Sequence, residues 1–558
     1  MPIVQAISPS RRRLILVLIL IPVFIGALDL TIVSAILPEV LTKLNIPIDS
    51  NLGSAAWAVS GYLLAYTVSM TVMGRVSDLI GRRSVYLVCL TIFIGGSWWV
   101  ATAHEAPTAL LNQVARQMLH QRPDLSQLTL IAVIIGRVIQ ALGAGAMVPV
   151  SMALIADLYP PEQRAQPIGI IGAIDTLGWV LGHLYGGLMV EFFNQRGDAI
   201  AQALHQVGLN WPAPDWHTLF YINVPLSLLA LILTWWVLRG VSHSPAQGRF
   251  DFVGAALISL SLVALNVGLG GSTEIVSSSS LLASDALSNP SPFSLPLLAA
   301  AIVCFGIFLL WEAFQRNPLI ELHLFRKRNV AAASFTNLMV GFCLMLGLVS
   351  AALLVYLRAD NASADSIAQA AQKAGILLSG LTIPMALAAI PGGYLADRIG
   401  YRRTTMIGMT LAGIGFLIAA VTWTEVTPDL ILGGEMAIAG VGLGLTISPI
   451  GTAVINDAGD SQRGVASALV IILRLVGMTL AVSGLTTFAI SRVRDLLASV
   501  QPFIPPAMTP DQIQHWAVHA YFQLGIHVID ELLAIGAVVS LLALLPALSL
   551  RGRGQSDT

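Results

Sequence analysis

Residues 74–83 read GRVSDLIGRR, and a second copy of this pattern, GYLADRIGYRR, stands at residues 393–403. Each copy follows an apolar run and carries an acid, Asp78 or Asp397, between two glycines and ahead of a pair of arginines. A loop that recurs in this detail at a large separation indicates an internal duplication. The repeat therefore divides the chain into two related halves, and this division decides the fold.

The composition is that of a membrane protein. The chain has 558 residues, of which 56% are hydrophobic and 11% are charged, whereas soluble domains carry roughly 25% charged residues. The net charge of -1 excludes the basic surface that nucleic-acid binding needs. The three cysteines lie in apolar runs without metal-ligand spacing, so we expect no metal and no cofactor.

Apolar runs of about helix length predict fourteen membrane-spanning helices. The first seven are expected near 14–37, 53–74, 84–104, 128–157, 166–190, 218–238 and 251–271. The second seven are expected near 294–315, 329–357, 372–395, 404–424, 430–456, 464–490 and 521–548. The fold class is therefore an all-α integral membrane protein.

The positive charges predict the orientation. With the N-terminus in the cytoplasm, the cytoplasmic segments hold 19 of the 29 Lys and Arg residues, as the positive-inside rule requires. We therefore expect a multi-pass protein of the inner or plasma membrane with both termini cytoplasmic. Long outward loops are expected at 105–127, 191–217 and 491–520, and a serine-rich linker at 277–292. The first of these loops has the apolar spacing of an amphipathic helix, although a plain solvated loop is an equal alternative.

A second group of matches aligns the halves at one offset, 299 residues, which takes Arg164 to Arg463. The matches are Gln163-Arg164 with Gln462-Arg463, Gly143 with Gly442, Gly145 with Gly444, and Gly178 with Gly477. Two six-helix halves related by an axis along the membrane normal are typical of one class of transporter. The sequence predicts pseudo-symmetric bundles at 1–239 and 329–558, with a two-helix insertion at 240–328.

The same offset places Asp175 on Arg474. Each residue lies 11 positions beyond its Gln-Arg landmark, roughly 16 Å into the bilayer at about 1.5 Å per residue. Charged side chains at that depth are costly and are functional by default. We expect the two side chains to face each other across a central cavity as an exchangeable pair; a structural ion pair that locks two helices is the alternative.

Asp29 and Arg137 are predicted to meet in the outer half of the membrane. Asp29 lies 16 residues beyond Arg13, roughly 24 Å along the first helix, and Arg137 is at comparable depth in the fourth. Making or breaking such a pair changes the proton affinity of the acid, which is what a proton-coupled carrier needs. The alternative is a permanently ionised structural pair.

The motifs resemble those of the major facilitator superfamily, specifically its fourteen-helix drug/proton antiporters. The matching segments are Leu28 to Pro38, Trp57 with Tyr62-Leu63-Leu64, the loop at Gly74, Asp78, Gly81, Arg82 and Arg83, Arg137 with Gln140, Gly178 with Gly182, Gly186 and Gly187, Trp216 to Pro225, and Asn317 to Phe325. Ala141 stands where a glycine is usual, and His183 stands where the helix-five motif has proline. The resemblance implies proton-coupled export of amphiphilic or hydrophobic small molecules, including drugs, by alternating access, with protons as the coupling ion.

Asp175, Arg474 and the phrase from Arg463 to Ser467 also look like the mycobacterial triacylglyceride transporter branch. There the implied cargo is a lipid, and an extracytoplasmic lipid-carrier protein would be an added partner. The sequence alone does not rank drug above lipid as the cargo.

The remaining candidates have structural alternatives beside their functional ones. The helix-five glycines permit close helix packing, which alone would explain them. Asp78 is expected to close the cytoplasmic side by accepting hydrogen bonds from a helix N-terminus or by pairing with an arginine. Glu435 and Asp530 are candidate cavity residues, and Glu312 is expected at an interface.

Other classes of protein fit poorly. The chain has no His-Glu-x-x-His, nucleophile elbow or Walker loop, so neither an enzyme nor ATP-driven transport is expected. A channel is disfavoured because two repeated halves suit alternating access.

Overall fold

The computed structural model describes residues 8–46, 54–119, 124–206, 208, 212–241, 248–269, 294–358, 364–424, 426–500 and 510–551. These residues are overwhelmingly helical, and they contain no strand. The serine-rich linker predicted at 277–292 lies outside the described residues.

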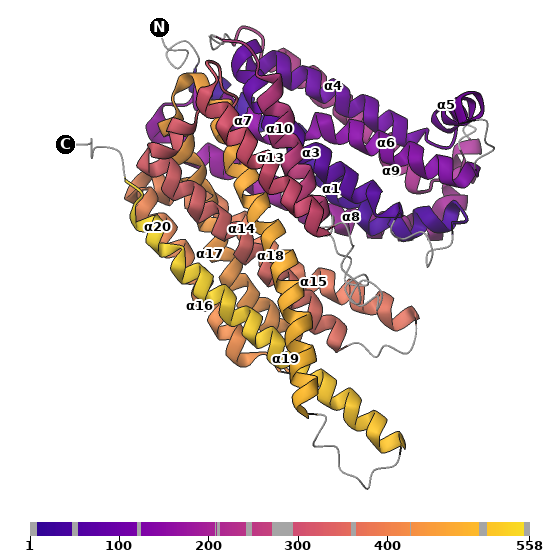
Figure 1. Cartoon of the computed structure of the whole chain (residues 1–558). Coiled ribbons are helices and arrows are strands. Elements are labelled where there is room, and N and C mark those ends of the chain that lie inside the picture. The colour runs from indigo at the N-terminus through magenta and orange to yellow at the C-terminus, as the bar shows by residue number, and fades with distance from the viewer. Residues whose placement is uncertain are drawn as a thin grey trace.

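The helices follow the predicted order (Figure 1). The N-terminal half comprises α1 (Pro9–Lys43), α3 (Trp57–Ile80), α4 (Arg82–Ala101), α5 (Ala106–Val114), α6 (Leu125–Ala144), α7 (Met147–Leu158), α8 (Ala165–Gln206) and α9 (Trp216–Val237). The segment between the halves, which is the predicted insertion, contributes α10 (Phe252–Gly268) and α13 (Ser294–Phe314). The C-terminal half comprises α14 (Arg328–Leu357), α15 (Ala364–Ile399), α16 (Tyr401–Thr422), α17 (Asp429–Ala458), α18 (Arg463–Val500), α19 (Pro510–Leu542) and α20 (Leu544–Leu548).

Twelve helical segments among the described residues are long and apolar enough to cross a membrane. One of them, Leu125–Leu158, combines α6 and α7. Helix α3 is not among the twelve, and α10 is a shorter apolar helix of 17 residues. The chain is therefore a multi-pass membrane protein. Since the predicted spans at α3 and α10 are not among the twelve, the total of fourteen spans stays a prediction.

The helix predicted as one unit at 128–157 is interrupted. Helix α6 ends at Ala144 and α7 begins at Met147. Pro149 lies four residues after Gly145 and has no backbone N–H to donate to the Gly145 carbonyl, so the helical hydrogen bond at this point cannot form. The interruption lets Gly145 approach the backbone of α3, where an added Cβ would lie 2.4 Å from the Tyr66 carbonyl oxygen.

Several helices are longer at their outer ends than predicted, most of all α8, α18 and α19. Helix α8 continues to Gln206 and α18 to Val500, and α19 begins at Pro510, so the loops expected at 191–217 and 491–520 are partly wrong. The 42 residues of α8 span roughly 63 Å, about twice the thickness of the hydrocarbon core. These extensions are polar and rich in helix formers such as Ala and Gln, so hydropathy misses them. At 105–127 the predicted helix forms as α5.

The glycines matched at the 299-residue offset make corresponding contacts in the two halves. Gly145 packs on α3 at Tyr66, and Gly444 packs on α15 at Met385. In the same way Gly143 and Gly442 pack on α4 and α16, and Gly178 and Gly477 pack on α1 and α14. Added Cβ atoms at these positions would approach backbone atoms closely, so glycine is required by close helix approach in both copies.

The halves meet through α3 against α18 and α8 against α15, and α10 packs on α3 and α13. In Figure 1 the two halves approach each other at one end and diverge toward α5 and the far end of α19. The approaching end carries the repeated Gly/Asp/Gly/Arg loops, and it is the end that the charge pattern predicts to be cytoplasmic.

Candidate functional site

A buried polar network surrounds Asp29 on α1. Arg137 Nη1 lies 2.5 Å from Asp29 Oδ2, and both side chains are fully buried. Gln140 Nε2 donates to Asp29 Oδ1 at 3.0 Å, and Asn223 Nδ2 donates to the same oxygen at 2.9 Å. The carboxylate thus accepts from α6 and α9 at once. A protonated Asp29 could not keep all of these bonds, because a carboxylic acid must donate one hydrogen itself.

Tyr62 of α3 completes the surroundings of Arg137. The guanidinium carbon lies 3.9 Å from the Tyr62 ring centroid, a cation–π contact that strengthens when the cation is desolvated. Gln140 also donates to Ser97 at 2.8 Å. The sequence paired Asp29 with Arg137 but missed the role of Asn223, which was visible only as part of the matching segment that ends at Pro225.

Asp175 and Arg474 meet between the halves. Arg474 Nη2 on α18 lies 3.5 Å from Asp175 Oδ2 on α8, and their side chains are 10% and 3% exposed. Asp175 Oδ1 and Arg474 Nε are buried and have no hydrogen-bond partner among the described residues. The pair is therefore deeply placed and loosely held, since a well-formed charge-assisted bond is about 2.7–2.9 Å long.

Asp78 bridges the halves at the end where they approach each other. Its carboxylate accepts from the backbone N–H groups of Gly464 at 2.9 Å and Val465 at 3.1 Å, in the first turn of α18. Arg82 Nη1 lies 2.8 Å from Asp78 Oδ1. A carboxylate at a helix N-terminus satisfies free N–H groups and complements the helix dipole.

Backbone geometry brings α3 and α18 together at this contact. An added Cβ at Gly74 would lie 2.8 Å from the Gly464 carbonyl oxygen, and one at Gly464 would lie 2.2 Å from the Gly74 carbonyl oxygen. Gly81 has φ of 110°, a conformation that favours glycine, and it links α3 to α4. Arg83 is half-buried beside it.

The second loop makes the related contact more weakly. Asp397 on α15 accepts from the Gln166 backbone N–H in the first turn of α8 at 3.3 Å. An added Cβ at Gly393 would lie 2.5 Å from the Ala165 carbonyl oxygen. Each signature loop therefore contacts the first turn of a long helix in the other half.

Two arginine links cross the same seam. Arg463 Nη1 lies 2.7 Å from Asp157 Oδ1, and Arg164 Nη1 donates to Asn456 Oδ1 at 2.6 Å. Arg82, which contacts Asp78, also places its Nε 2.5 Å from Asp157 Oδ2. Asp157 therefore links Arg82 to Arg463 at the start of α18. Sequence reasoning missed both acceptors, although the 299-residue offset that pairs the arginines also pairs Asp157 with Asn456.

The glycines of the fifth predicted membrane helix, which is α8, pack mostly on α1. Added Cβ atoms at Gly178, Gly182 and Gly186 would lie 2.5 Å from Ala27 Cβ, 2.3 Å from the Leu28 carbonyl oxygen and 3.0 Å from the Ile32 carbonyl oxygen, respectively. At Gly187 an added Cβ would meet nothing within 4 Å. His183 Nε2 lies 3.0 Å from Ser34 Oγ on α1, so this face joins α8 to α1 through polar as well as close apolar contacts.

The other predicted acids lie outside the contacts described above. Glu435, a candidate cavity residue, accepts from Thr422 Oγ1 at 2.8 Å and from Trp423 Nε1 at 2.9 Å. These bonds join α17 to the end of α16, and the role of Glu435 in a cavity stays a prediction. Asp530 is half-buried on α19. Glu312 accepts from the Ile320 backbone N–H at 3.3 Å, a contact between α13 and the segment that follows it.

The comparisons with known proteins point in one direction. The family model described as Major Facilitator Superfamily matches residues 19–482. The chain is 32% identical over 492 residues to a triacylglyceride transporter of Mycobacteroides abscessus, covering 86% of this chain and 83% of the relative. It is 31% identical over 504 residues to a triacylglyceride transporter of Mycobacterium tuberculosis, covering 87% and 84%.

Solved structures show the same fold. The human organic anion transporter MFSD10 (TETRAN) superposes with a TM-score of 0.55 at 15% identity and covers 97% of this chain and 100% of its own. The proton:xylose symporter XylE superposes with a TM-score of 0.53 at 14% identity and covers 95% of each chain.

Proposed function

The chain belongs to the major facilitator superfamily and is a transporter rather than an enzyme, and we propose that it exports a neutral lipid of the triacylglyceride class. The observation that carries this proposal is that relatives named triacylglyceride transporters align with 86–87% of the chain. The sequence motifs alone allow either a drug or a lipid as the cargo, and these relatives favour the lipid.

The proposed architecture is that of fourteen spans. Residues 1–239 and 329–558 form pseudo-symmetric six-helix bundles, and residues 240–328 form the insertion; α3 and α10 are the thirteenth and fourteenth spans. The matched glycine contacts on α3 and α15, on α4 and α16, and on α1 and α14 support this arrangement. In the cell the protein is placed in the inner or plasma membrane with both termini in the cytoplasm, which the positive charges support.

The transport cycle is proposed to open and close the seam between the halves. The contacts of Asp78 with Gly464 and of Arg463 with Asp157 hold the cytoplasmic ends together. Alternating access moves one bundle against the other, so these contacts must break before cargo can load from the cytoplasmic leaflet. The structure then corresponds to the state that is closed to the cytoplasm.

Protons are the proposed coupling ion, with no other cofactor. Asp29 with Arg137 and Asp175 with Arg474 are buried acid–base pairs, and protonation of either acid would remove the attraction that holds its arginine. The glycine face of α8 against α1 places the helix that carries Asp175 directly beside the helix that carries Asp29. This packing supports the proposal that protonation of one of the two acids affects the other.

Amphiphilic drugs remain the second cargo class, because the motifs resemble those of drug/proton antiporters. An extracytoplasmic lipid-carrier protein is the partner that a lipid cargo would require, since a triacylglyceride does not dissolve in water.

The test uses the full chain reconstituted in proteoliposomes with a radiolabelled triacylglyceride in the membrane. Transfer to an external lipid acceptor should rise when a proton gradient is imposed and should fall to background in the Asp29→Asn variant. Ethidium flux is measured in the same vesicles. Gradient-driven ethidium flux without triacylglyceride transfer would replace the lipid proposal with the drug proposal, and no gradient-driven flux of either would overturn proton-coupled export.

A further inference from the structure

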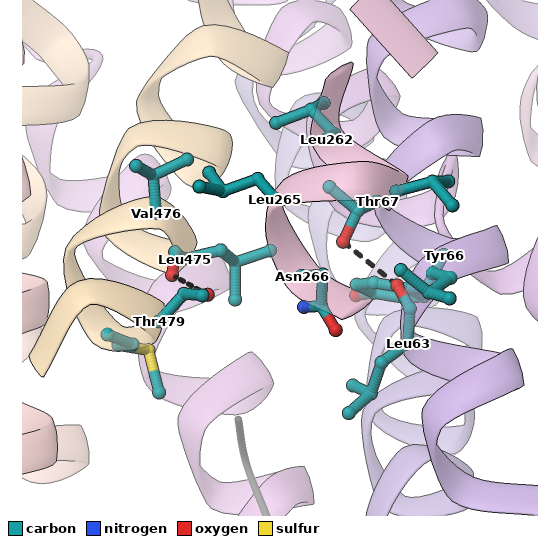
Figure 2. Close-up of a pocket in the computed structure, with 12 residues that line it drawn as sticks. Leu63, Tyr66, Thr67, Leu262, Leu265, Asn266, Leu475, Val476 and Thr479 are labelled. Atoms are coloured by element: carbon teal, nitrogen blue, oxygen red, sulfur yellow. Dashed lines mark hydrogen bonds between the residues drawn. The ribbon is translucent and has the colours of Figure 1, made fainter. Parts of the chain in front are cut away.

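A pocket outside the polar networks lies where three parts of the chain meet. Its twelve lining residues come from α3, α10 and α18 (Figure 2). They are Leu63, Leu64, Tyr66, Thr67, Leu262, Val263, Leu265, Asn266, Leu475, Val476, Met478 and Thr479. The empty space amounts to about 560 Å³ when the open mouth is included.

We propose that this pocket is a seat for one acyl chain of the neutral lipid cargo. The proposal rests on the proposed function and adds a location to it. Because the enclosed part of this space is small, the pocket suits a single hydrocarbon chain rather than a whole glyceride.

The lining chemistry favours hydrocarbon. None of the twelve residues is charged. The two threonine hydroxyls donate to their own helices, Thr67 Oγ1 to the Leu63 carbonyl and Thr479 Oγ1 to the Leu475 carbonyl, both at 2.9 Å. Figure 2 shows these two bonds on opposite walls. Since each hydroxyl has only one hydrogen to donate, neither has a hydrogen left for a lipid headgroup. Tyr66 and Asn266 are the other two polar lining residues, and the remaining eight are apolar.

The pocket lies within the hydrocarbon core of the membrane. Leu475 and Thr479 lie 12 and 16 residues beyond Arg463 on α18, roughly 18–24 Å from the cytoplasmic end of the helix, where the core is about 30 Å thick. Acyl chains of phospholipids and of glycerides both reach this depth, so the choice of the neutral lipid rests on the proposed function, and the two probes of the test separate the two lipid classes.

Residues that line the pocket also neighbour residues next to or within both buried ion pairs. Tyr66 stacks on Tyr62 with ring centroids 6.0 Å apart, and Tyr62 lies under the Arg137 guanidinium. On the opposite wall Leu475 directly follows Arg474, the partner of Asp175. Because the walls belong to both halves and to the insertion, movement of the halves must change the shape of the pocket. An acyl chain here would therefore bind differently in the two transport states.

The test maps lipid contacts by photolabelling of the full chain in nanodiscs. The probes are a triacylglyceride and a phosphatidylcholine that each carry a diazirine on one acyl chain, and labelled peptides are identified by mass spectrometry. We expect the triacylglyceride probe to label residues 63–67, 262–266 and 475–479. Leu265→Trp fills the pocket and should reduce this labelling about tenfold, because forcing a chain into a filled site carries an overpacking cost.

Two variants keep the test decisive. Leu260 lies on the same helix as Leu265 but outside the pocket lining, and its side chain is 58% exposed. Leu260→Trp therefore does not fill the pocket, and labelling of the pocket should stay unchanged. Leu265→Ala enlarges the pocket without overpacking and should increase labelling, which covers the case in which the tryptophan variant fails to fold.

Three outcomes would overturn the seat: equal effects of the two tryptophan variants, label confined to other surfaces, or equal labelling by the phosphatidylcholine probe. Transfer of radiolabelled triacylglyceride is measured separately in proteoliposomes. Transfer with label elsewhere defeats only the seat, whereas pocket labelling without transfer defeats only the proposed function.

Discussion

Asp157 and Asn456 hold equivalent places in the two halves, and each accepts a hydrogen bond from an arginine of the opposite half. Arg463 Nη1 lies 2.7 Å from Asp157 Oδ1, and Arg164 Nη1 lies 2.6 Å from Asn456 Oδ1. The first link joins two opposite charges and the second joins a charge to a neutral amide. Hydrogen bonds between two charged groups are the stronger kind, so the two arginine links hold the seam between the halves with unequal strength.

Asn456→Asp should therefore strengthen the weaker link. A carboxylate facing Arg164 would favour the state that is closed to the cytoplasm and slow the return of the carrier. We expect about a several-fold loss of cytoplasmic modification at a reporter cysteine, in line with the added strength of a charge-assisted bond. Ile447→Cys is a suitable reporter because Ile447 is buried on the seam near Gly172.

The reporter needs a background in which Cys89, Cys304 and Cys343 are replaced. Asn456→Leu is the matched control, since it removes the acceptor and should increase modification. Equal modification in all three proteins would show that the Arg164 link does not hold the seam.

Asp78→Asn should shift the protein toward the state open to the cytoplasm. The N–H groups of Gly464 and Val465 bind different oxygens of the carboxylate. In the amide one of these oxygens becomes an NH2 donor, so one N–H group loses its acceptor, and the charge opposite Arg82 is lost. A cost of about 1–3 kcal/mol corresponds to about a 5- to 150-fold population shift, read as faster cytoplasmic modification at Ile447→Cys. Asp397→Asn is the matched comparison and should do less, because Asp397 accepts a longer bond at 3.3 Å. A larger effect from Asp397→Asn would contradict the assignment.

The repeated elements could be predicted from the sequence because helix packing and helix termini impose local rules. A loop whose acid contacts a helix N-terminus needs the same residues in both halves. A position where two helices touch needs a glycine in both halves, so both features recur in the sequence. The offset also placed Asp175 on Arg474, which the structure brings to 3.5 Å.

What the sequence left out depends on tertiary contact or on polar helix ends. Asn223 matters through its bond to Asp29 on another helix, and no local pattern shows that contact. The bond of Glu435 with Trp423 could not be predicted either, because an acid in an apolar run looks the same whether it faces a cavity or accepts from a neighbouring helix. The outer part of α8 was missed because its residues are helical without being apolar.

Asp29→Asn should abolish proton-driven transport while the protein still folds. The amide can still take part in hydrogen bonds with Gln140 and Asn223, but it cannot exchange a proton, so coupling and not packing is lost. Triacylglyceride transfer with and without a proton gradient measures the effect. Asn223→Ala is the comparison: it removes one donor to Asp29, so transport should persist with a shifted pH dependence. Gradient-driven transfer that survives in Asp29→Asn would place the proton site elsewhere.

The charge pair between the halves gives the sharpest test. Asp175 and Arg474 are buried and 3.5 Å apart, so removing either partner leaves a charge without compensation. The cost reaches about 3–5 kcal/mol for a fully buried pair and falls where water reaches the site. Asp175→Ala and Arg474→Ala should therefore each lower expression and thermal stability in detergent.

Exchanging the two charges distinguishes a true pair from a coincidence of the duplication. The double variant Asp175→Arg with Arg474→Asp keeps opposite charges at matched depth on α8 and α18, so stability should recover above that of Asp175→Arg or Arg474→Asp alone. Transport should stay impaired, because the acid now lies on α18, away from the face of α8 that packs on α1 and Asp29. A double variant no more stable than the worse single variant would mean that the two side chains do not interact, and full recovery of transport would mean that the pair only locks the helices.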